Sequence, residues 1–356
     1  MMKIAIAGTN GLAQFIAYYL SQITSHSFIF LSTATNPGLK ERDWQVLVVP
    51  YDNQSSLSYI LRGVDVVIST ISGEAQLALV DAAATAQVRH FIPSGFSGPQ
   101  QCAPQMVAAS TNEWQSLISR LEHHQLESSM RYTIFTCGIF YEQFCPGGLN
   151  AMQISTITSQ NAGIGEEGAF LVDLRAGKAM IPVTPGSQQE AVICMTSARD
   201  TARYLVAAMQ TYKDMTIWPN EFKFCTERMT VSELLNTCSR VRGAPIPPTF
   251  VTPQHLQKTI NQAQSASNGR LRSNMSQLLA CAEGAFDFSP TDINLPATVL
   301  AIARTEEPAE HFEEWLGSVW TSPPSADTSA TASASLGVPS HETSRSSSAK
   351  SGTKSR

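Results

Sequence analysis

The stretch Lys3–Ala13, KIAIAGTNGLA, joins a short apolar run to a turn that contains two glycines. The run Lys3–Ala7 is typical of a buried strand, and Gly11–Ile23 carries apolar residues at helical spacing. Gly8 and Gly11 therefore stand where a strand ends and a helix begins. A tight turn at such a place favours residues without a Cβ, and the unpaired amides of the helix start favour a phosphate group.

The alternation of short apolar runs with helical patterns continues to about residue 137. Further strands are expected at Phe28–Leu31, Val46–Val49, Asp65–Ser69, His90–Pro93 and Tyr132–Cys137. Further helices are expected at Ser55–Leu61, Glu74–Ala86 and residues 105–126. Strands that alternate with helices pair in parallel, and strands that are apolar on both faces suit a sheet covered on each side. We therefore predict an α/β fold of the Rossmann type, with a doubly wound parallel sheet.

The glycine turn has the position of a dinucleotide-binding loop, because it follows the first strand of a βαβ series. A diphosphate can approach the backbone only where side chains are absent. The residues expected to hold NAD(P) here are Gly8, Thr9, Asn10, Gly11, Leu12 and Ala13. Gln14 stands where some dinucleotide folds have a third glycine. The alternative is an ordinary turn that binds no ligand, since Gly-x-x-Gly alone is a weak motif.

The tip of the second strand decides between NAD and NADP in this fold, through an acid or an arginine respectively. Here the tip reads Leu31-Ser32-Thr33-Ala34-Thr35 and has neither. The hydroxyls of Ser32 and Thr33 suit a ribose hydroxyl or a phosphate equally. Lys40 and Arg42 are near enough in sequence to fold over a phosphate, or they are ordinary surface charges. We expect NADP as the cofactor, with NAD as the alternative.

Two more loops follow strands at the edge of the sheet where ligands bind. Asp52 and Asn53 follow the third strand and are expected to bond the adenine edge, unless they form a simple turn. Thr70, Ile71 and Ser72 follow the fourth strand and are expected to pass along the ribose and diphosphate.

Beyond about residue 145 the alternation weakens. A strand is expected at Ala191–Thr196, and helices at Ser197–Gln210, Thr230–Gly243 and Glu307–Trp320. We expect an NAD(P)-binding Rossmann domain over residues 1–150 and a smaller C-terminal α+β lobe over residues 151–320 that binds the substrate and is interleaved with it. Residues 321–356 are mostly Ser, Thr, Ala, Pro and Gly, so we expect a disordered tail.

Composition excludes several classes of function. The formal net charge of −5 argues against direct binding of nucleic acid or of an anionic membrane. The seven cysteines form no Cys-x-x-Cys pair, so neither a zinc site nor any other metal site is expected. The sequence has no Gly-x-Ser-x-Gly, His-Glu-x-x-His or Walker lysine motif, which disfavours hydrolase and ATPase activities. Without a long apolar segment, a cytoplasmic location is expected, with a nuclear one as the alternative.

Several segments together resemble the NmrA-like family of atypical short-chain dehydrogenases, which is related to the isoflavone-reductase-like enzymes of plants. They are GTNGLA at 8–13, VDVVISTI at 64–71, RHFIPSGF at 89–96, YTIFTCGIF at 132–140 and WPNEF at 218–222. The resemblance runs from residue 3 to about Trp320. It implies a cleft for a small molecule between two lobes, with Ser94 beside the nicotinamide. It also implies that the turn Gly138, Ile139 and Phe140 closes over the cofactor.

The sequence departs from these relatives where their chemistry is expected. Reductases of the group carry a lysine early in the helix after the Ser94 loop, and that position falls near Glu113–Ser116 here. The sequence has no lysine between Lys40 and Lys178. The remaining catalytic candidates are Ser94, which would orient a substrate oxygen, and Tyr141, which would donate a phenol proton or simply pack its ring.

We predict an NAD(P)-dependent oxidoreductase of the NmrA type that reduces a small, secondary-metabolite substrate by hydride transfer. The alternative is a catalytically inactive NAD(P)-sensing regulator that binds a protein partner such as a transcription factor.

Overall fold

The computed structural model describes residues 1–97, 108–154, 165–183, 190–212, 214–305 and 307–321. The expected tail at 321–356 lies outside this range beyond Thr321, and the expected helix at 105–126 is described from Ala108.

A six-stranded parallel sheet forms the centre of the first half of the chain, in the order β3-β2-β1-β4-β5-β6. Its strands are β1 (Lys3–Ala7), β2 (Ser27–Ser32), β3 (Val46–Val48), β4 (Val66–Ser69), β5 (His90–Ile92) and β6 (Arg131–Tyr132). The helices that connect them are α1 (Gly11–Ile23), α2 (Pro37–Glu41), α3 (Gln54–Ile60), α4 (Glu74–Thr85) and α5 (Ala108–Glu127). The predicted Rossmann-type α/β fold is confirmed.

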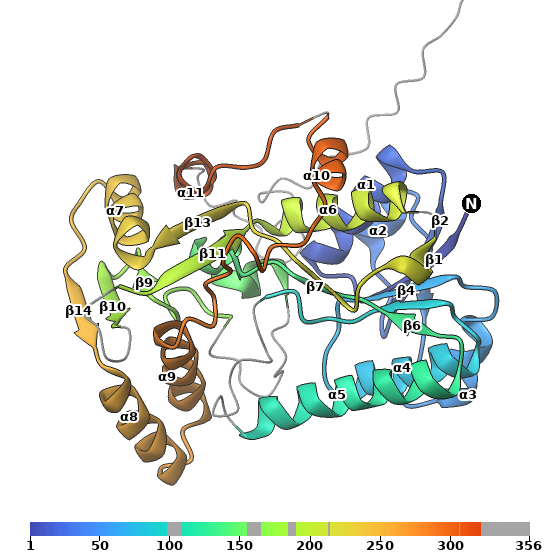
Figure 1. The fold of residues 1–356 in the computed structure, drawn as a ribbon, viewed down its shortest axis with the longest axis horizontal. Coiled ribbons are helices and arrows are strands. Elements are labelled where there is room, and N and C mark those ends of the chain that lie inside the picture. Colours follow the sequence, from blue (N-terminus) through green and yellow to red (C-terminus); the bar gives the residue numbers. More distant parts are fainter. Residues whose placement is uncertain (98–107, 155–164, 184–189, 213, 306, 322–356) are drawn as a thin grey trace, which may run out of the picture.

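Helices cover both faces of this sheet (Figure 1). On one face α1 packs against α6 (Ala198–Thr211), which in turn contacts α10 (Ala297–Ala303). On the other face lie α3, α4 and α5. The alternate side chains of β1 enter the two cores, Ile4 and Ile6 on the first face and Ala5 and Ala7 on the second. Strands buried on both sides account for the continuous apolar runs in the sequence.

The second half of the chain forms smaller sheets. These comprise β8 (Ile139–Phe140) with β11 (Val192–Thr196) and β13 (Glu227–Thr230), and β9 (Val172–Asp173) with β10 (Lys178–Pro182) and β14 (Pro248–Val251). Around them lie α7 (Val231–Arg242), α8 (Pro253–Ser265), α9 (Gly269–Ala282) and α11 (Phe312–Thr321). The described residues also form the 3-10 helices η1 (Tyr141–Phe144), η2 (Gly148–Met152) and η3 (Met215–Ile217). The division into residues 1–150 and 151–320 stays a prediction.

Most expected elements agree to within one or two residues, and two differ more. The strand expected at Tyr132–Cys137 is divided, because β7 (Ile134–Thr136) leaves the main sheet and pairs with β12 (Glu221–Lys223). Thr133 lies at the division and donates its hydroxyl to the carbonyl of Pro219 at 2.8 Å. The helix expected from Glu307 begins only at Phe312. The segment before it is held by contacts to α6, because Arg203 donates to the carbonyl of Glu307 and the amide of Glu310 donates to Asp200.

Capping residues fix the start of α6 and both ends of α7. The Ser197 hydroxyl accepts from the amide of Asp200 at the start of α6. Thr230 and Glu233 form a capping box at the start of α7. Gly243 ends α7 with φ of 71°, a conformation that glycine adopts without strain.

A buried carboxyl group joins η1 to the start of α6. Both oxygens of Glu142 accept from the amide of Ala198 at 3.0 Å, and the side chain is buried. Burial, together with the nearby carboxyl groups of Glu310 and Asp200, raises the pKa of Glu142 from 4.5 to about 8, against the lowering effect of the backbone amides bound to it.

We expect this group to make stability depend on pH. A carboxyl with a raised pKa in the folded state contributes stability that is complete below about 4.5 and is lost as the pH rises towards about 8. Glu142→Gln keeps an oxygen that accepts from Ala198 and removes the titration. Denaturant titrations across this range should show the wild type losing stability relative to the variant as the pH rises. Parallel profiles for the two proteins would contradict the assignment.

Candidate functional site

The turn between β1 and α1 lies tightly against the end of β4. Gly8 has φ of 100°, and its amide donates to the carbonyl of Leu31 at 2.9 Å. A Cβ at Gly8 would collide with the hydroxyl of Thr70. Thr70 is itself fixed, because its amide and its hydroxyl both donate to the carbonyl of Ala7 at 2.9 Å. Glycine at position 8 is therefore required by both conformation and space.

Asn10 fixes the start of α1. Its Oδ1 accepts from the amide of Ala13 at 3.0 Å, and its Nδ2 donates to the carbonyl of Thr70 at 3.0 Å. Gln14, at the place of a third glycine, donates from Nε2 to the carbonyl of Thr9 at 3.0 Å. The side chains of Asn10 and Gln14 thus hold the turn from its two ends.

The first helical amides of α1 remain available. Within the described residues, no group accepts a hydrogen bond from the amides of Gly11 and Leu12. Unpaired amides at the start of a helix are the usual binding partners of a phosphate group. The loop therefore offers two donors at the carboxyl edge of β1, where open parallel sheets bind ligands.

The bare face of Gly11 is covered by η2. A Cβ at Gly11 would collide with the Cε of Met152, and it would lie 3.0 Å from the Cβ and 3.3 Å from the carbonyl oxygen of that residue. Met152 is buried in the core on this face together with Leu149 and Ile154. Since backbone as well as side-chain atoms of Met152 approach Gly11, a side-chain rotation alone would not uncover the loop.

The loop suits the pyrophosphate of a dinucleotide in three respects. It lies at the turn after the first strand, Gly8 gives it the required backbone conformation, and the amides of Gly11 and Leu12 are free to donate. The space that a bare second glycine normally leaves for that pyrophosphate is filled by Met152. Binding of a dinucleotide thus requires η2 to shift away from Gly11.

The loop after β5 is closely packed. Ser94 is 5% exposed, and its amide donates to Oε1 of Gln76 at 2.7 Å. A Cβ at Gly95 would lie 3.0 Å from Cη2 of Trp114 and closer still to Cζ3. The indole ring of Trp114 thus fills the space that a side chain at position 95 would take.

Glu113 begins the stretch Glu113–Ser116, near which the lysine of the relatives is expected. Its Oε1 accepts from the amide of Gly73, the residue that precedes α4, at 2.6 Å. Burial raises the pKa of the Glu113 carboxyl. This position therefore holds an acid bound to a helix start, and it offers no ammonium group to the site.

Tyr141 is not placed to donate a proton in a cleft. Its side chain is fully buried, its hydroxyl donates to the carbonyl of Glu310 at 3.2 Å, and its ring packs edge-on against Phe312. Burial raises the pKa of the phenol. The position of Tyr141 agrees with the hypothesis that its ring packs in the core. It does not agree with the hypothesis that its phenol donates a proton to a substrate.

The neighbouring turn is also buried. Ile139 and Phe140 form β8 and lie in two different cores. Gly138 packs directly on the backbone of Cys194, so that a Cβ would collide with the carbonyl oxygen there. These contacts describe a packed strand, and the expectation that Gly138, Ile139 and Phe140 close over a cofactor gains no support from them.

The tip of β2 presents hydroxyl groups to the surface. Thr33 is exposed, and the Ser32 hydroxyl accepts from the amide of Ala34 at 3.2 Å. Arg42 lies over the ring of Trp44, with 5.3 Å between its Cζ and the ring centroid, and Lys40 is exposed.

After β3, Asp52 is exposed and Asn53 caps α3. The Oδ1 of Asn53 accepts from the amide of Ser56 at 2.9 Å. This contact agrees with the alternative expectation that Asn53 belongs to a simple turn. After β4, Ile71 and Ser72 are half-buried.

Met152 and Gln76 were not among the predicted site residues. Both reach the site only through long-range packing, so no local motif could have indicated them.

No group of three or more His, Cys, Asp or Glu side chains in the described part of the chain is arranged to hold a metal ion. No helix among the described residues is long and apolar enough to cross a membrane.

The sequence model of the NmrA-like family matches residues 32–287, and the chain belongs to this family. The matched range begins at the end of β2, so the glycine loop precedes it. Comparison with curated protein sequences gave no match.

Solved structures show the same fold at low sequence identity. Leucoanthocyanidin reductase of Vitis vinifera, in a complex with NADPH, is 17% identical, covers 88% of this chain and 98% of its own, and has a TM-score of 0.60. The quinone oxidoreductase QOR2 of Escherichia coli, in a complex with NADPH, is 13% identical over 89% of this chain and 100% of its own, with a TM-score of 0.58. A protein named AtPrR2, with NADP+ and (+)-pinoresinol, is 16% identical over 89% and 98%, with a TM-score of 0.62.

Proposed function

We propose that this protein is an NADP(H)-dependent oxidoreductase that reduces a small organic molecule. The observation that carries the proposal is the turn from β1 to α1, with its free amides at Gly11 and Leu12 and a glycine at position 8 that no other residue could replace. Membership of the NmrA-like family and the NADPH complexes of two structural neighbours support the same cofactor.

The residues proposed to hold the cofactor follow the carboxyl edge of the sheet. The amides of Gly11 and Leu12 bind the pyrophosphate, once η2 has moved away from Gly11. The hydroxyls of Ser32 and Thr33 bind the 2′-phosphate of NADP or the ribose hydroxyls of NAD. The remaining proposed contacts are Gly8, Thr9, Asn10, Ala13, Asp52, Thr70, Ile71 and Ser72.

NADPH, when bound, supplies the hydride for a carbonyl or a polarised double bond. We assign Ser94 to orienting the substrate oxygen, because it follows β5 at the carboxyl edge of the sheet. With Tyr141 buried in a core and Glu113 in place of a lysine, the proton comes from water or from the substrate itself.

The burial of Tyr141 and the acid at Glu113 also favour a second function. A protein that binds the dinucleotide without turnover, and transmits its presence to a protein partner, needs no proton donor. The displacement of Met152 would then be the signal, because it changes the packing of a buried segment.

Purified full-length protein offered NADPH and a panel of enones, imines and ketones distinguishes the two functions. Consumption of NADPH that depends on one of these substrates supports the oxidoreductase. Tight binding of reduced and oxidised cofactor with equal affinity, and no turnover across the panel, supports the regulator. Calorimetry that detects no association with NADPH, NADP+, NADH or NAD+ would refute both.

A further inference from the structure

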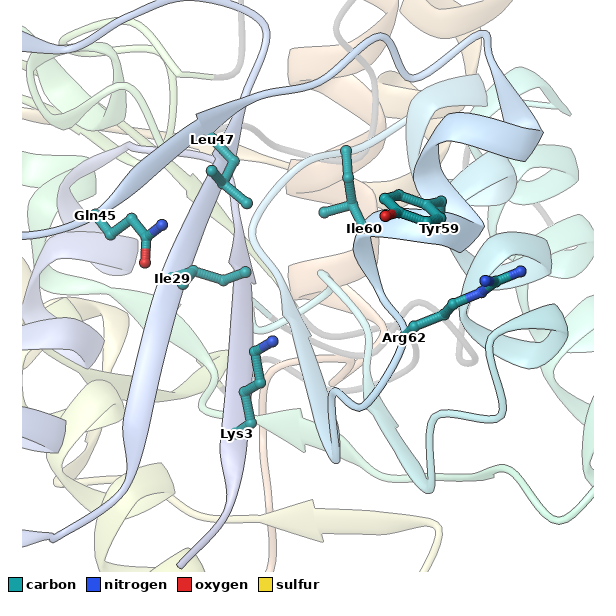
Figure 2. A pocket seen from close by; sticks show the side chains of 7 residues that line it. All are labelled: Lys3, Ile29, Gln45, Leu47, Tyr59, Ile60 and Arg62. Atoms are coloured by element: carbon teal, nitrogen blue, oxygen red, sulfur yellow. The ribbon is translucent and has the colours of Figure 1, made fainter.

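An open cavity of about 540 Å³ lies beside the edge strand β3, on the face of the sheet that carries α3. Figure 2 shows that the residues from the strands and those from the end of α3 stand on opposite sides of it. The helix α3 ends at Ile60, so it leaves part of this sheet face uncovered. The volume is in the range of small-molecule sites.

The floor of this edge cavity is formed by three apolar side chains, with the amide group of Gln45 beside them. Ile29 and Leu47 come from β2 and β3, and Ile60 comes from the last turn of α3. Leu47 and Ile60 are half-buried, so their side chains remain in contact with solvent inside the cavity. Covering such surface with an apolar ligand is favourable by about 25 cal/mol per Å² of area removed from water.

The rim of the edge cavity is cationic. Lys3 and Arg62 line it, both are exposed, and no Asp or Glu is among the lining residues. Asp65, three residues beyond Arg62, lies beside the backbone of Lys3: it accepts from the Lys3 amide at 2.8 Å, and it pairs with the guanidinium of Arg89 at 3.0 Å. Within the described part of the chain, neither Lys3 Nζ nor the guanidinium of Arg62 has a carboxylate partner.

The aromatic ring of Tyr59 lies beside Arg62 at the rim of the cavity. The Cζ of Arg62 lies 5.3 Å from the centroid of the Tyr59 ring, and that ring is 69% exposed. This contact holds the guanidinium beside the cavity without neutralising its charge. The cavity thus has an exposed aromatic ring with a guanidinium on one side and the ammonium group of Lys3 on the strand side, and such groups suit an anion with an apolar body.

We propose that the edge cavity binds an amphipathic organic carboxylate, with its aliphatic body on Ile29, Leu47 and Ile60 and its carboxylate between Lys3 and Arg62. The site is separate from the dinucleotide loop. Lys3 precedes Gly8 by five residues of extended chain, which corresponds to roughly 16 Å along β1. The proposal therefore does not depend on the proposed function.

Calorimetric titration of the full-length protein with octanoate tests this site, with octan-1-ol as the uncharged analogue of similar length. We expect saturable binding of one octanoate and weaker binding of octan-1-ol. Lys3→Met and Arg62→Met each remove a charge and keep an apolar stem. Each should weaken octanoate binding by about threefold and the double variant by about tenfold, as expected for exposed ion pairs.

The controls separate this site from others. Lys258→Met removes an exposed cation from α8 and should leave octanoate binding unchanged. Saturating NADPH should also leave it unchanged, whether or not the protein binds NADPH. Three results would overturn the proposal: no saturable binding of octanoate, equal binding by the double variant, or equal binding of octan-1-ol.

Discussion

Gly11→Val is expected to lower the affinity for NADP(H) by about 5- to 150-fold, because a side chain forced into a packed contact costs about 1–3 kcal/mol. The branched side chain would stand on the bare face of the loop, where the pyrophosphate approaches the amides of Gly11 and Leu12. The same side chain also collides with Met152 in the free protein, so the variant will lose some stability. Calorimetry with NADPH, together with a melting curve, measures both effects.

Substitution of Met152 separates the loss of cofactor binding in Gly11→Val from its collision with Met152 in the free protein. Met152→Ala removes the end of the side chain that lies over Gly11 and leaves the Cβ and the carbonyl in place. We expect it to bind NADPH more tightly than the wild type, because less packing has to be displaced. The loss of a buried Met side chain should destabilise the fold by about 2–5 kcal/mol.

The double variant Gly11→Val/Met152→Ala should regain part of the packing and still fail to bind NADPH. Undiminished binding of NADPH by Gly11→Val would show that the pyrophosphate does not lie on this loop. Equal affinities of wild type and Met152→Ala would show that η2 does not compete with the cofactor.

Residues close in sequence made the first half of the fold predictable. The strand Lys3–Ala7 and the helix Gly11–Ile23 have the predicted bounds, because apolar spacing and the glycine turn act locally. The division at Thr133 was not predictable, since its partner Pro219 lies 86 residues further along the chain.

The candidate site was predictable only in its local part. The turn from Gly8 to Ala13 stands where the pattern placed it, at the carboxyl edge of the sheet. The cover over Gly11 comes from Met152, far along the chain, and no spacing rule connects them. Tyr141 was considered for catalysis because it follows a motif of the family, but its direction depends on Phe312 and Glu310 near the other end of the chain.

Arg203→Met is expected to destabilise the fold by about 3–5 kcal/mol, because it leaves the buried carboxylate of Asp200 without its cation. Arg203 forms an ion pair with Asp200 one helical turn earlier, and it donates to the carbonyl of Glu307 at 2.7 Å. The other oxygen of Asp200 accepts from the amide of Glu310 at 3.0 Å. The pair thus ties α6 to the segment that precedes α11.

The pH dependence of this loss distinguishes a charge effect from a packing effect. Burial raises the pKa of Asp200, and the cation of Arg203 opposes that rise, so Arg203→Met should raise this pKa further. A raised pKa in the folded state means that stability is lost as the pH rises from the unfolded value. Denaturant titrations should therefore show a smaller loss at acidic pH than at neutral pH. Asp200→Asn in the Arg203→Met background should recover part of the neutral-pH loss, and a loss that is the same at both pH values would leave only the packing of the Arg203 stem to explain it.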